Sequence, residues 1–502
     1  MRLEAALDAA AARRGEHPAL VLANGDSLSF AQLATRSRQF ASQLIATGIH
    51  AGDRVAIVSR HDLDALTLFW AVLRVGGIVV WLNDDARASD LPDVLHNSDP
   101  AAVFVQTDKQ RKLFDATPAY ASRVRPLADL ATTASHDSAA LPELTDEDAP
   151  AAIVYTSGSS GRPKGVCLSH KNILTVDHAV VSHMPIGEDD SYMMVVPMHY
   201  VHGLMQLTVH AVAGATVHFF DNFLFPKKVI QALQTTRVRG FSGVPFHFNA
   251  LITRGGLLDS ELPDLRWVTV TGGKLAADTI LKVIEHFPAL EFHIAYGQSE
   301  CAPRATALHP SRTATKPDSV GRPIPGVQVL LLSEDDEPVA RGEVGEVVIA
   351  GDNIMLGYWN DPDATALALD AQGRLRTGDL GRFDDDGDLF LVGRRSAMIK
   401  SAGERIIPEE LERALMACDG VDEAVVVGVD DALLGQRVVA HVTLGDHAYD
   451  DNDAATAAIR AHMSQAVALA RVPREYHVWD EFPRKANGKP DRVALAITKA
   501  DA

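Results

Sequence analysis

Cysteine is scarce in this sequence. Its 502 residues include three, Cys167, Cys301 and Cys418. They form no CxxC pair and are too few for the disulfide framework of a small secreted domain. Sparse cysteine without pairing motifs is typical of a reducing compartment, so we expect the chain to be cytoplasmic.

Positive charge is in deficit. The chain has 47 Lys and Arg against 66 Asp and Glu, a formal net charge of −19. Proteins that bind nucleic acid or anionic membranes generally draw their affinity from basic side chains that neutralise phosphates. We therefore predict neither a nucleic-acid nor a membrane partner, although one small anion in a local basic pocket remains compatible with this charge.

The sequence also lacks a long hydrophobic run. Its most apolar stretch, residues 66–82, is interrupted by Arg74, Gly76 and Gly77 and is too broken to span a bilayer. The first residues are alanine-rich and amphipathic and have no apolar signal-peptide core. We interpret residues 66–82 as a buried helix followed by a buried strand.

The rest of the composition is that of a globular protein, with 47% hydrophobic and 23% charged residues. The length predicts two or more domains. Short apolar runs alternate with helical patterns up to about residue 390, which predicts mainly parallel sheets covered by helices. The expected strands of this part are residues 54–59, 77–82, 101–106, 152–156, 192–196, 216–220, 240–244, 267–271 and 292–296.

The pattern changes after residue 325. Strand-like segments follow one another through turns such as Asp386-Gly387, which predicts a more antiparallel, barrel-like section. A further set of strand and helix patterns fills the last ~110 residues, enough for a small α+β domain. We predict an α/β fold with a large N-terminal domain at residues 1–393 and a small C-terminal domain at residues 394–502.

The strongest motif is residues 155–165, YTSGSSGRPKG, which follow an apolar strand. Glycines let the backbone turn its N–H groups toward an anion, hydroxyl groups add donors, and Lys164 adds a positive charge. This chemistry predicts a loop that holds nucleotide phosphates, with a solvated Ser/Gly-rich loop as the alternative. It is not a Walker A loop, because Lys164 follows Gly161 by three residues and precedes another glycine.

Six segments in this order resemble motifs of the acyl-adenylate-forming superfamily, which includes acyl-CoA synthetases, free-standing adenylation domains and luciferase. They are residues 155–165, 296–300 (YGQSE), 342–359, 376–379 (RTGD), 393–408 and 483–489. The resemblance implies an AMP-forming ligase. Such an enzyme uses ATP and Mg²⁺ to activate a carboxylic acid as acyl-AMP and transfers the acyl group to a thiol. It also implies that the C-terminal domain is mobile and rotates between the two half-reactions.

The resemblance assigns the nucleotide site. Lys489 is expected to bridge the attacking carboxylate and the α-phosphate, Glu300 to hold Mg²⁺, and Ser299 to hydrogen-bond the α-phosphate in place of the usual threonine. Asp379 is expected to accept hydrogen bonds from both ribose hydroxyls. The other expected ATP or AMP ligands are Thr156, Ser157, Gly158, Ser159, Ser160, Gly161, Lys164, Tyr296, Gly297 and Arg394.

The acid pocket is expected to take its lining from four segments, and it includes Tyr200, Val201, His202, Gly243, Gly273, Lys274 and Arg304. Amino-acid-activating members have an aspartate near the position of Val201. Without it a buried ammonium would be unpaired, at a cost of several kcal/mol, which disfavours an ordinary α-amino acid. Lys274 and Arg304 either bind a second anionic or strongly polar group of the acid or face solvent and pair with local acids.

The thiol is expected to approach past Lys400 and Gly403, and Ser396 stands at the hinge, where the family usually has Asp or Lys. We predict coenzyme A as the acceptor. The phosphopantetheine arm of a separate acyl or peptidyl carrier protein is the alternative partner. A luciferase-like oxygenase and a non-catalytic nucleotide-binding protein are readings from other classes, and Lys489 argues against the second because nucleotide binding alone would not need it. The sequence leaves the acid and the oligomeric state open.

Overall fold

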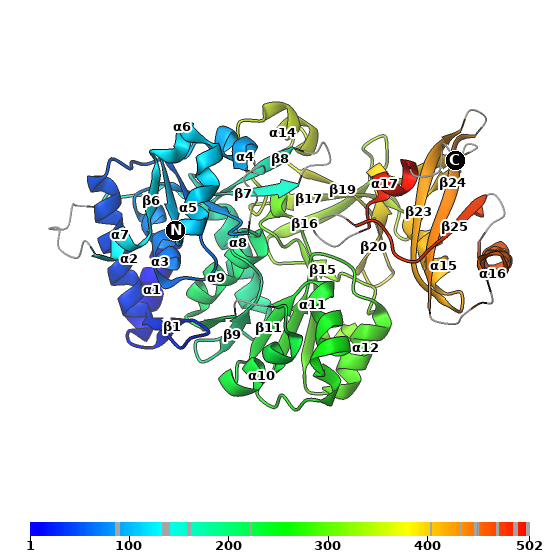
Figure 1. Cartoon of the computed structure of the whole chain (residues 1–502), viewed down its shortest axis with the longest axis horizontal. Helices are drawn as coiled ribbons and strands as arrows, with labels where there is room; N and C mark the ends of the chain where they lie inside the picture. The colour runs from blue at the N-terminus through cyan, green and yellow to red at the C-terminus, as the bar shows by residue number, and fades with distance from the viewer. Residues whose placement is uncertain are drawn as a thin grey trace. The chain divides into compact units, whose positions relative to one another are not determined.

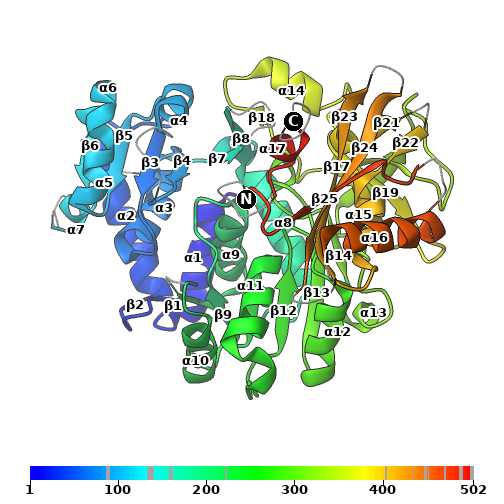
Figure 2. The same cartoon turned by 45° about the vertical axis from the view of Figure 1, so that its right-hand side comes forward.

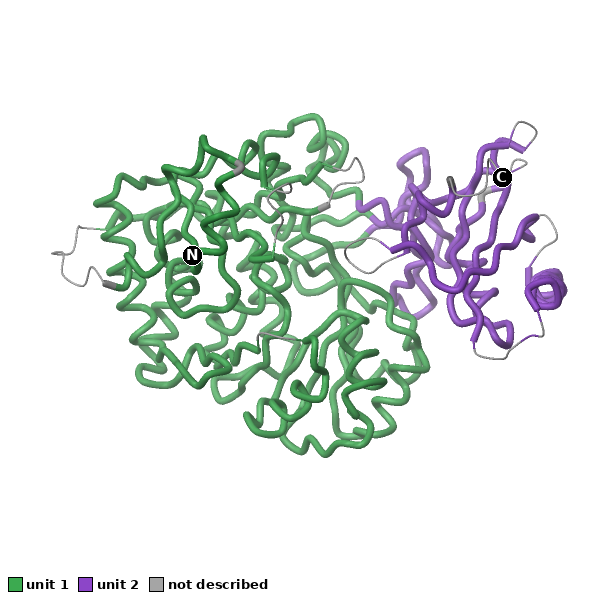
Figure 3. Tube along the Cα trace, in the orientation of Figure 1, with its two compact units in different colours: residues 1–329, 348–376 green, residues 330–347, 377–502 purple. Residues whose placement is uncertain are grey.

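The computed structural model describes residues 1–85, 91–132, 141–157, 162–220, 223–401, 404–431, 434–445, 449, 451–467, 471–484 and 490–497. The chain forms two compact units (Figure 3). Unit 1 comprises Met1–Val329 and Val348–Arg376, and unit 2 comprises Leu330–Val347 and Thr377–Ala502. The expected boundary after residue 393 lies inside unit 2; it concerns which segment moves during the reaction and stays a prediction.

A nine-stranded sheet forms one part of unit 1 and includes the first two strands of the chain (Figure 1). Its six central strands run parallel, and β2, β14 and β15 extend it antiparallel at the two edges. In spatial order the strands are β15 (Arg322–Pro323), β14 (Thr306–Leu308), β13 (Glu291–Tyr296), β12 (Trp267–Val270), β11 (Gly240–Gly243), β9 (Ser191–Met194), β10 (Thr216–Phe219), β1 (Pro18–Val21) and β2 (Ser27–Ser29).

A seven-stranded sheet forms the other part of unit 1. Strands β7, β4, β3, β5 and β6 are parallel, and β8 and β18 continue the sheet antiparallel beside β7. In spatial order the strands are β18 (Gly357–Tyr358), β8 (Pro163–Ser169), β7 (Pro150–Ser157), β4 (Ile78–Leu82), β3 (Arg54–Val58), β5 (Ala102–Val105) and β6 (Val124–Pro126). The mainly parallel sheets expected from the alternating pattern are confirmed.

Helices cover these sheets (Figure 2). Helix α3 (Leu63–Arg74) packs on β4, and both are buried, so the interpretation of residues 66–82 as a buried helix and strand is confirmed. Helix α9 (Val201–Ala213) packs on β10, and α1 (Leu3–Arg14) contacts α3, α9 and α8 (His170–His183). The other helices of unit 1 are α2 (Phe30–Ala46), α4 (Leu91–Ser98), α5 (Asp108–Lys112), α6 (Pro118–Ala121), α7 (Ala128–Thr132), α10 (Pro226–Thr236), α11 (Pro245–Ala250), α12 (Ala277–His286), α13 (Pro310–Thr313) and α14 (Pro362–Ala368).

A four-stranded sheet contains the segments that join the two units: β16 (Val327–Leu332), β17 (Gly345–Gly351), β19 (Leu375–Phe383) and β20 (Leu389–Arg394). The remainder of unit 2 is a small α+β fold, as expected. Its five-stranded sheet is antiparallel except where β25 joins β24. Its strands are β21 (Ile399–Ser401), β22 (Glu404–Ile406), β23 (Val421–Asp431), β24 (Gly435–Leu444) and β25 (Glu475–Trp479), and its helices are α15 (Pro408–Met416), α16 (Asn452–Ala466) and α17 (Arg492–Ile497). Among the described residues, no helix is long and apolar enough to cross a membrane.

Candidate active site

The expected phosphate loop connects the strands of a tight hairpin, β7 and β8. Thr156 pairs with Lys164 across this hairpin, and Ser157 pairs with Pro163. Tyr155 fixes β7 from the side, because its hydroxyl donates a hydrogen bond of 2.6 Å to Asn97 Oδ1. The hairpin therefore holds both ends of the loop. The loop residues between them, Gly158, Ser159, Ser160 and Gly161, lie outside the described part of the chain.

Lys164 and Glu300 meet at one tyrosine of unit 1, Tyr358. The Tyr358 hydroxyl donates a hydrogen bond of 2.7 Å to Glu300 Oε1. The Lys164 ammonium lies 4.9 Å from the centre of the Tyr358 ring, within range of a cation–π interaction. Strand β18 explains this meeting, since it pairs with β8 and places Tyr358 opposite Val166.

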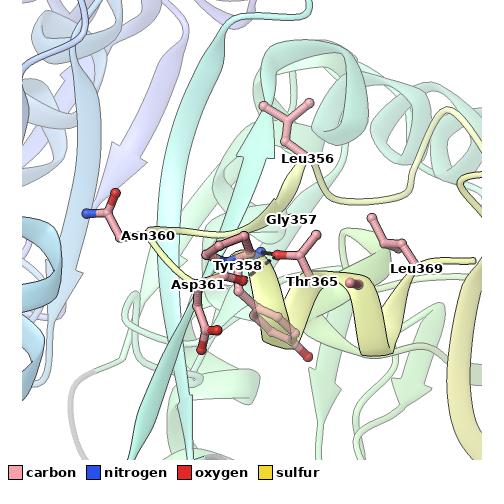
Figure 4. A pocket seen from close by; sticks show the side chains of 9 residues that line it. Leu356, Gly357, Tyr358, Asn360, Asp361, Thr365 and Leu369 are labelled. Carbon is pink, nitrogen blue, oxygen red and sulfur yellow. Dashed lines mark hydrogen bonds between the residues drawn. The ribbon is translucent and has the colours of Figure 1, made fainter.

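The backbone of Tyr358 is held by a hydrogen bond, as its hydroxyl is. Its N–H donates a hydrogen bond of 2.9 Å to Thr365 Oγ1 in helix α14, and the Asp361 carboxylate caps the start of that helix. Leu356, Tyr358, Asp361, Thr365 and Leu369 are among the residues that line a pocket at this point (Figure 4). The tyrosine is thus positioned from both ends.

The electrostatics of this group suit a magnesium ion and phosphates. Burial, reinforced by the nearby Glu300 charge, raises the pKa of Tyr358, so the phenol stays protonated and donates. Within the described residues, no ion pair engages the Lys164 ammonium and no hydrogen bond engages Glu300 Oε2. A carboxylate oxygen is the ligand Mg²⁺ prefers, and a lysine ammonium binds phosphate as a point charge.

The loop that carries Ser299 and Glu300 closes on itself. Strand β13 ends at the buried Tyr296, whose carbonyl accepts a hydrogen bond of 2.8 Å from Ala305 N. A side chain on Gly297 would place its Cβ 2.1 Å from the Pro303 carbonyl oxygen, so only glycine fits this approach. Ser299 follows in a short 3₁₀ turn, Ser299–Cys301.

In unit 2 the structure brings two of the expected nucleotide ligands together. Asp379 and Arg394 are register partners on β19 and β20, and Arg394 Nε lies 2.9 Å from Asp379 Oδ1. Lys400 is an exposed residue of β21, and Ser396 lies in the 3₁₀ turn Arg395–Ala397 that follows β20. Lys489 and Gly403 lie outside the described residues.

The expected acid-pocket residues of unit 1 fall into a buried group and a surface group. Val201 and His202 begin helix α9 and are buried, and Gly243 ends β11. Tyr200 is 52% exposed just before α9. Gly273 and Lys274 follow β12, where Lys274 Nζ pairs with Asp318 Oδ1 at 2.5 Å near the surface.

His202 anchors a buried hydrogen-bond network. Its Nε2 lies 2.8 Å from Ser242 Oγ on β11, and that hydroxyl also bonds the Tyr192 hydroxyl on β9. Burial, with a smaller effect of the Arg304 charge, lowers the pKa of His202 to about 3. The imidazole is therefore neutral at neutral pH. Arg304, whose charge influences His202, is also buried.

Comparison with known proteins places this architecture. The sequence profile described as "AMP-binding enzyme" matches residues 7–359, and the profile "AMP-binding enzyme C-terminal domain" matches residues 410–489. The chain belongs to the AMP-binding enzyme family. This membership agrees with the resemblance of its six motifs.

Individual relatives span almost the whole chain. It is 31% identical over 479 residues to a feruloyl-CoA synthase of an Amycolatopsis species, covering 95% of each protein. It is 28% identical over 504 residues to a sulfoacetate–CoA ligase of Cupriavidus necator, covering 94% of this chain and 92% of that one. The crystal structure of ATP-bound MatB from Rhodopseudomonas palustris superposes with a TM-score of 0.90 at 27% identity, covering 100% and 99% of the two chains.

As a member of this family, the protein is an AMP-forming acid–thiol ligase. It uses ATP with Mg²⁺ and the thiol of coenzyme A or of phosphopantetheine, and it takes a small carboxylic acid.

Two features of the site escaped the sequence reasoning. Tyr358 lies inside a recognised motif, residues 342–359, yet no role was predicted for it, because its contact with Glu300 spans 58 positions of the chain. Tyr192 and Ser242 were not singled out either. Their position within two apolar strands could have indicated this network, since a buried hydroxyl needs a hydrogen-bond partner.

Proposed function

We propose that this enzyme activates a small carboxylic acid as its acyl-adenylate and transfers the acyl group to coenzyme A. The meeting of Lys164, Tyr358 and Glu300 in unit 1 is the observation that carries the proposal. A lysine ammonium and a carboxylate lie beside the hairpin of the expected phosphate loop, which supports roles for them in binding phosphate and metal. A protein that only bound a nucleoside would not need both charges there.

In the first half-reaction, a carboxylate oxygen of the acid attacks the α-phosphorus of ATP and the bond to pyrophosphate breaks. Charge builds on the phosphoryl oxygens, so cations and hydroxyl donors near them lower the barrier. Lys164 would bind the phosphates, Ser299 would donate to the α-phosphate, and Glu300 would hold the Mg²⁺ that neutralises phosphate charge. Lys489 would bridge the carboxylate and the α-phosphate.

In the second half-reaction, the thiol sulfur attacks the acyl carbonyl carbon, the bond to AMP breaks, and the thiol proton is released. Asp379 and Arg394 would hold the ribose. We propose that residues 394–502 rotate about Ser396 between the two steps and bring Lys400 and Gly403 toward the thiol. A short serine side chain still permits a turn at this hinge.

Coenzyme A is the proposed acceptor because the curated relatives named above are a CoA synthase and a CoA ligase. Those two names give acids of different size and charge, so they leave the acid of this enzyme open. Transfer to a carrier protein would use the same thiol chemistry as transfer to coenzyme A. The two acceptors differ only in the group attached beyond the pantetheine arm.

The test is a product measurement with ATP, Mg²⁺ and a panel of carboxylic acids. We expect acid-dependent pyrophosphate release, and an acyl-CoA thioester when coenzyme A is added. If pyrophosphate appears but the thioester forms only with a phosphopantetheinylated carrier protein, the acceptor proposal is wrong and adenylation stands. Light emission with oxygen and no added thiol would instead favour a luciferase-like enzyme.

A further inference from the structure

Arg304 is a buried arginine that has no carboxylate partner in the described part of the chain. It follows the loop that carries Glu300, and its side chain is 2% exposed. One guanidinium nitrogen, Nη1, lies 3.4 Å from Met184 Sδ, and a thioether is a weak acceptor. Among the described residues, no carboxylate lies within ion-pair distance of Arg304.

The described groups that interact electrostatically with Arg304 are polar but carry no compensating charge. Besides the larger effect of burial, its positive charge acts to lower the pKa values of Tyr192, of His202 and of His183 at the end of α8. Burial raises the pKa of Tyr192, and burial lowers the pKa of His183 to about 4, so both are neutral at neutral pH. The Arg304 guanidinium keeps its proton, because burial lowers its pKa only to about 10. One uncompensated positive charge therefore sits in this cluster.

An unpaired buried charge is strongly destabilising, because desolvation removes its water and nothing replaces it. Proteins keep such destabilising groups where function requires them. A negative group that entered the cluster would supply the missing partner. Structural stability alone gives no reason to place an arginine here rather than a leucine or methionine of similar length.

The position of Arg304 connects the cluster to the acid. Its Cα is four residues from Glu300, so the two backbone positions lie within about 14 Å even for an extended chain. His202 and Ser242 belong to two segments expected to line the acid pocket, the start of α9 and the end of β11. Ligands of parallel α/β sheets bind beyond the carboxyl ends of the strands, where these segments lie.

We propose that the Arg304 guanidinium binds a second anionic group, a carboxylate or sulfonate, at the end of the substrate remote from the carboxylate that is adenylated. The planar guanidinium offers parallel N–H donors that match the oxygens of such a group. Lys274 does not share this role, because Asp318 already pairs with it near the surface. This assignment rests on the proposed function of the site and names its substrate class.

The test compares acids of equal chain length that differ only at the far end: a monocarboxylic acid, the dicarboxylic acid, its mono-amide and the sulfonate analogue, over three to eight carbons. Pyrophosphate release gives kcat/KM for each. We expect the wild type to prefer an anionic end over the matched monocarboxylic acid by about a hundredfold or more, as a site built for a polar group rejects the analogue that lacks it. The chain-length series also shows which of carboxylate and sulfonate fits.

Arg304→Met should reduce this preference to within about threefold, chiefly by lowering kcat/KM for the acids with an anionic far end, because the far-end contact is lost. Arg304→Lys keeps the charge without the planar fork and should retain part of the preference; it replaces the methionine variant if that one fails to fold. Arg13→Met is the matched control, because it removes an exposed arginine of α1 that pairs with Glu188. This variant should keep the wild-type preference.

Three results would overturn the proposal: a wild type that prefers monocarboxylic acids at every length, equal use of the neutral mono-amide, or an Arg304→Met variant that slows all acids alike. In each case thioester formation would leave the proposed function standing. If no acid gave pyrophosphate, the proposed function would fail. The anion site at Arg304 would then be tested by the change in Tm on adding the dicarboxylates alone. A rise in Tm that Arg304→Met abolishes would support the anion site, and no rise would refute it.

Discussion

Tyr358 shows how one side chain can organise two charges of opposite sign. Its hydroxyl holds Glu300 and its ring face lies beneath Lys164. The carboxylate and the ammonium thereby keep separate partners, and each stays available to a ligand. We regard Tyr358 as a positioning residue, because it would orient Glu300 without contacting the reacting atoms.

Tyr358→Phe should raise the Mg²⁺ concentration that gives half-maximal pyrophosphate release by about tenfold or more, the usual effect of losing a partner behind a metal ligand. The ring and its contact with Lys164 remain, so KM for ATP at saturating Mg²⁺ should change less. Tyr155→Phe, which removes a hydroxyl bonded to Asn97, is the matched control. An unchanged Mg²⁺ requirement in Tyr358→Phe would refute the positioning role.

Asp177 is a second buried ionisable side chain, in the helical layer of unit 1. Its side chain is fully buried in α8, and Oδ1 accepts a hydrogen bond of 3.1 Å from Thr208 in α9. Burial raises the pKa of this carboxyl well above its ordinary value. Because the folded-state pKa is raised, the folded protein holds a proton that the unfolded chain releases above about pH 4, and stability falls as pH rises from there toward the folded-state pKa.

Asp177→Asn removes this titration. The Tm of the variant minus that of the wild type should therefore increase from pH 5.5 to pH 7.5, whatever constant offset the amide introduces. Thermal unfolding at both pH values measures it, and taking the difference cancels the titration of other groups. A difference that stays flat or decreases with pH would contradict the inferred pKa direction.

At the scale of elements, the loop after β13 is shaped by close backbone approach rather than by side-chain packing. Gly297 meets the Pro303 carbonyl, and Ala302 adopts a left-handed conformation with φ of 52°. That conformation costs an alanine about 1–2 kcal/mol, so the surrounding contacts hold the loop in place. The same loop carries Ser299, Glu300 and Arg304.

Gly297→Ala should force this loop to shift, lowering kcat/KM for pyrophosphate release at least about tenfold and lowering Tm, since overpacking a tight site costs about 1–3 kcal/mol. Gly187→Ala is the matched control, because its nearest neighbour, Asp190 Oδ2, lies at an ordinary 3.6 Å. Wild-type rates in Gly297→Ala would show that the loop is not constrained as the structure indicates.

The sequence is sufficient to predict the parallel strands, because a strand buried on both faces is a continuous apolar run. Strands β3 (Arg54–Val58) and β12 (Trp267–Val270) lie where such runs predict them. The two-residue β18 could not be predicted, because pairing with β8 defines it rather than its own composition. The burial of Arg304 could not be predicted from the sequence either, since a charged residue is ordinarily exposed.

Among the site residues too, some could be predicted from local motifs and others only from the folded structure. Motif resemblance was enough to nominate Lys164 and Glu300, which are 136 positions apart in the chain, but it gave no indication that Tyr358 connects them. For Lys274 the residue type alone left two readings open, and the structure pairs it with Asp318. Contacts between distant segments depend on the fold and are not written in any local pattern.

At the scale of the whole molecule, the account requires two units with separate tasks. Unit 1 carries Lys164, Glu300 and the residues expected to line the acid pocket, and unit 2 carries Asp379, Arg394, Lys400 and Lys489. Asp379 precedes the proposed mobile segment, residues 394–502, so only part of unit 2 would change position between the two steps.

Lys489→Ala should abolish adenylate formation, lowering pyrophosphate release by about a hundredfold or more, because a charge aimed at the transition state is lost. ATP binding, followed by thermal shift, should be largely retained. Lys282→Ala, an exposed lysine of α12, serves as the control. Normal adenylation by Lys489→Ala would overturn the assigned role.

The central claim is tested most directly by following ATP labelled at the α-phosphate with an accepted acid, Mg²⁺ and coenzyme A. The account predicts that labelled AMP, pyrophosphate and acyl-CoA form in equal amounts, and that labelled acyl-AMP accumulates when coenzyme A is withheld. Acid-dependent formation of ADP and phosphate, or nucleotide turnover that is independent of any acid, would contradict it.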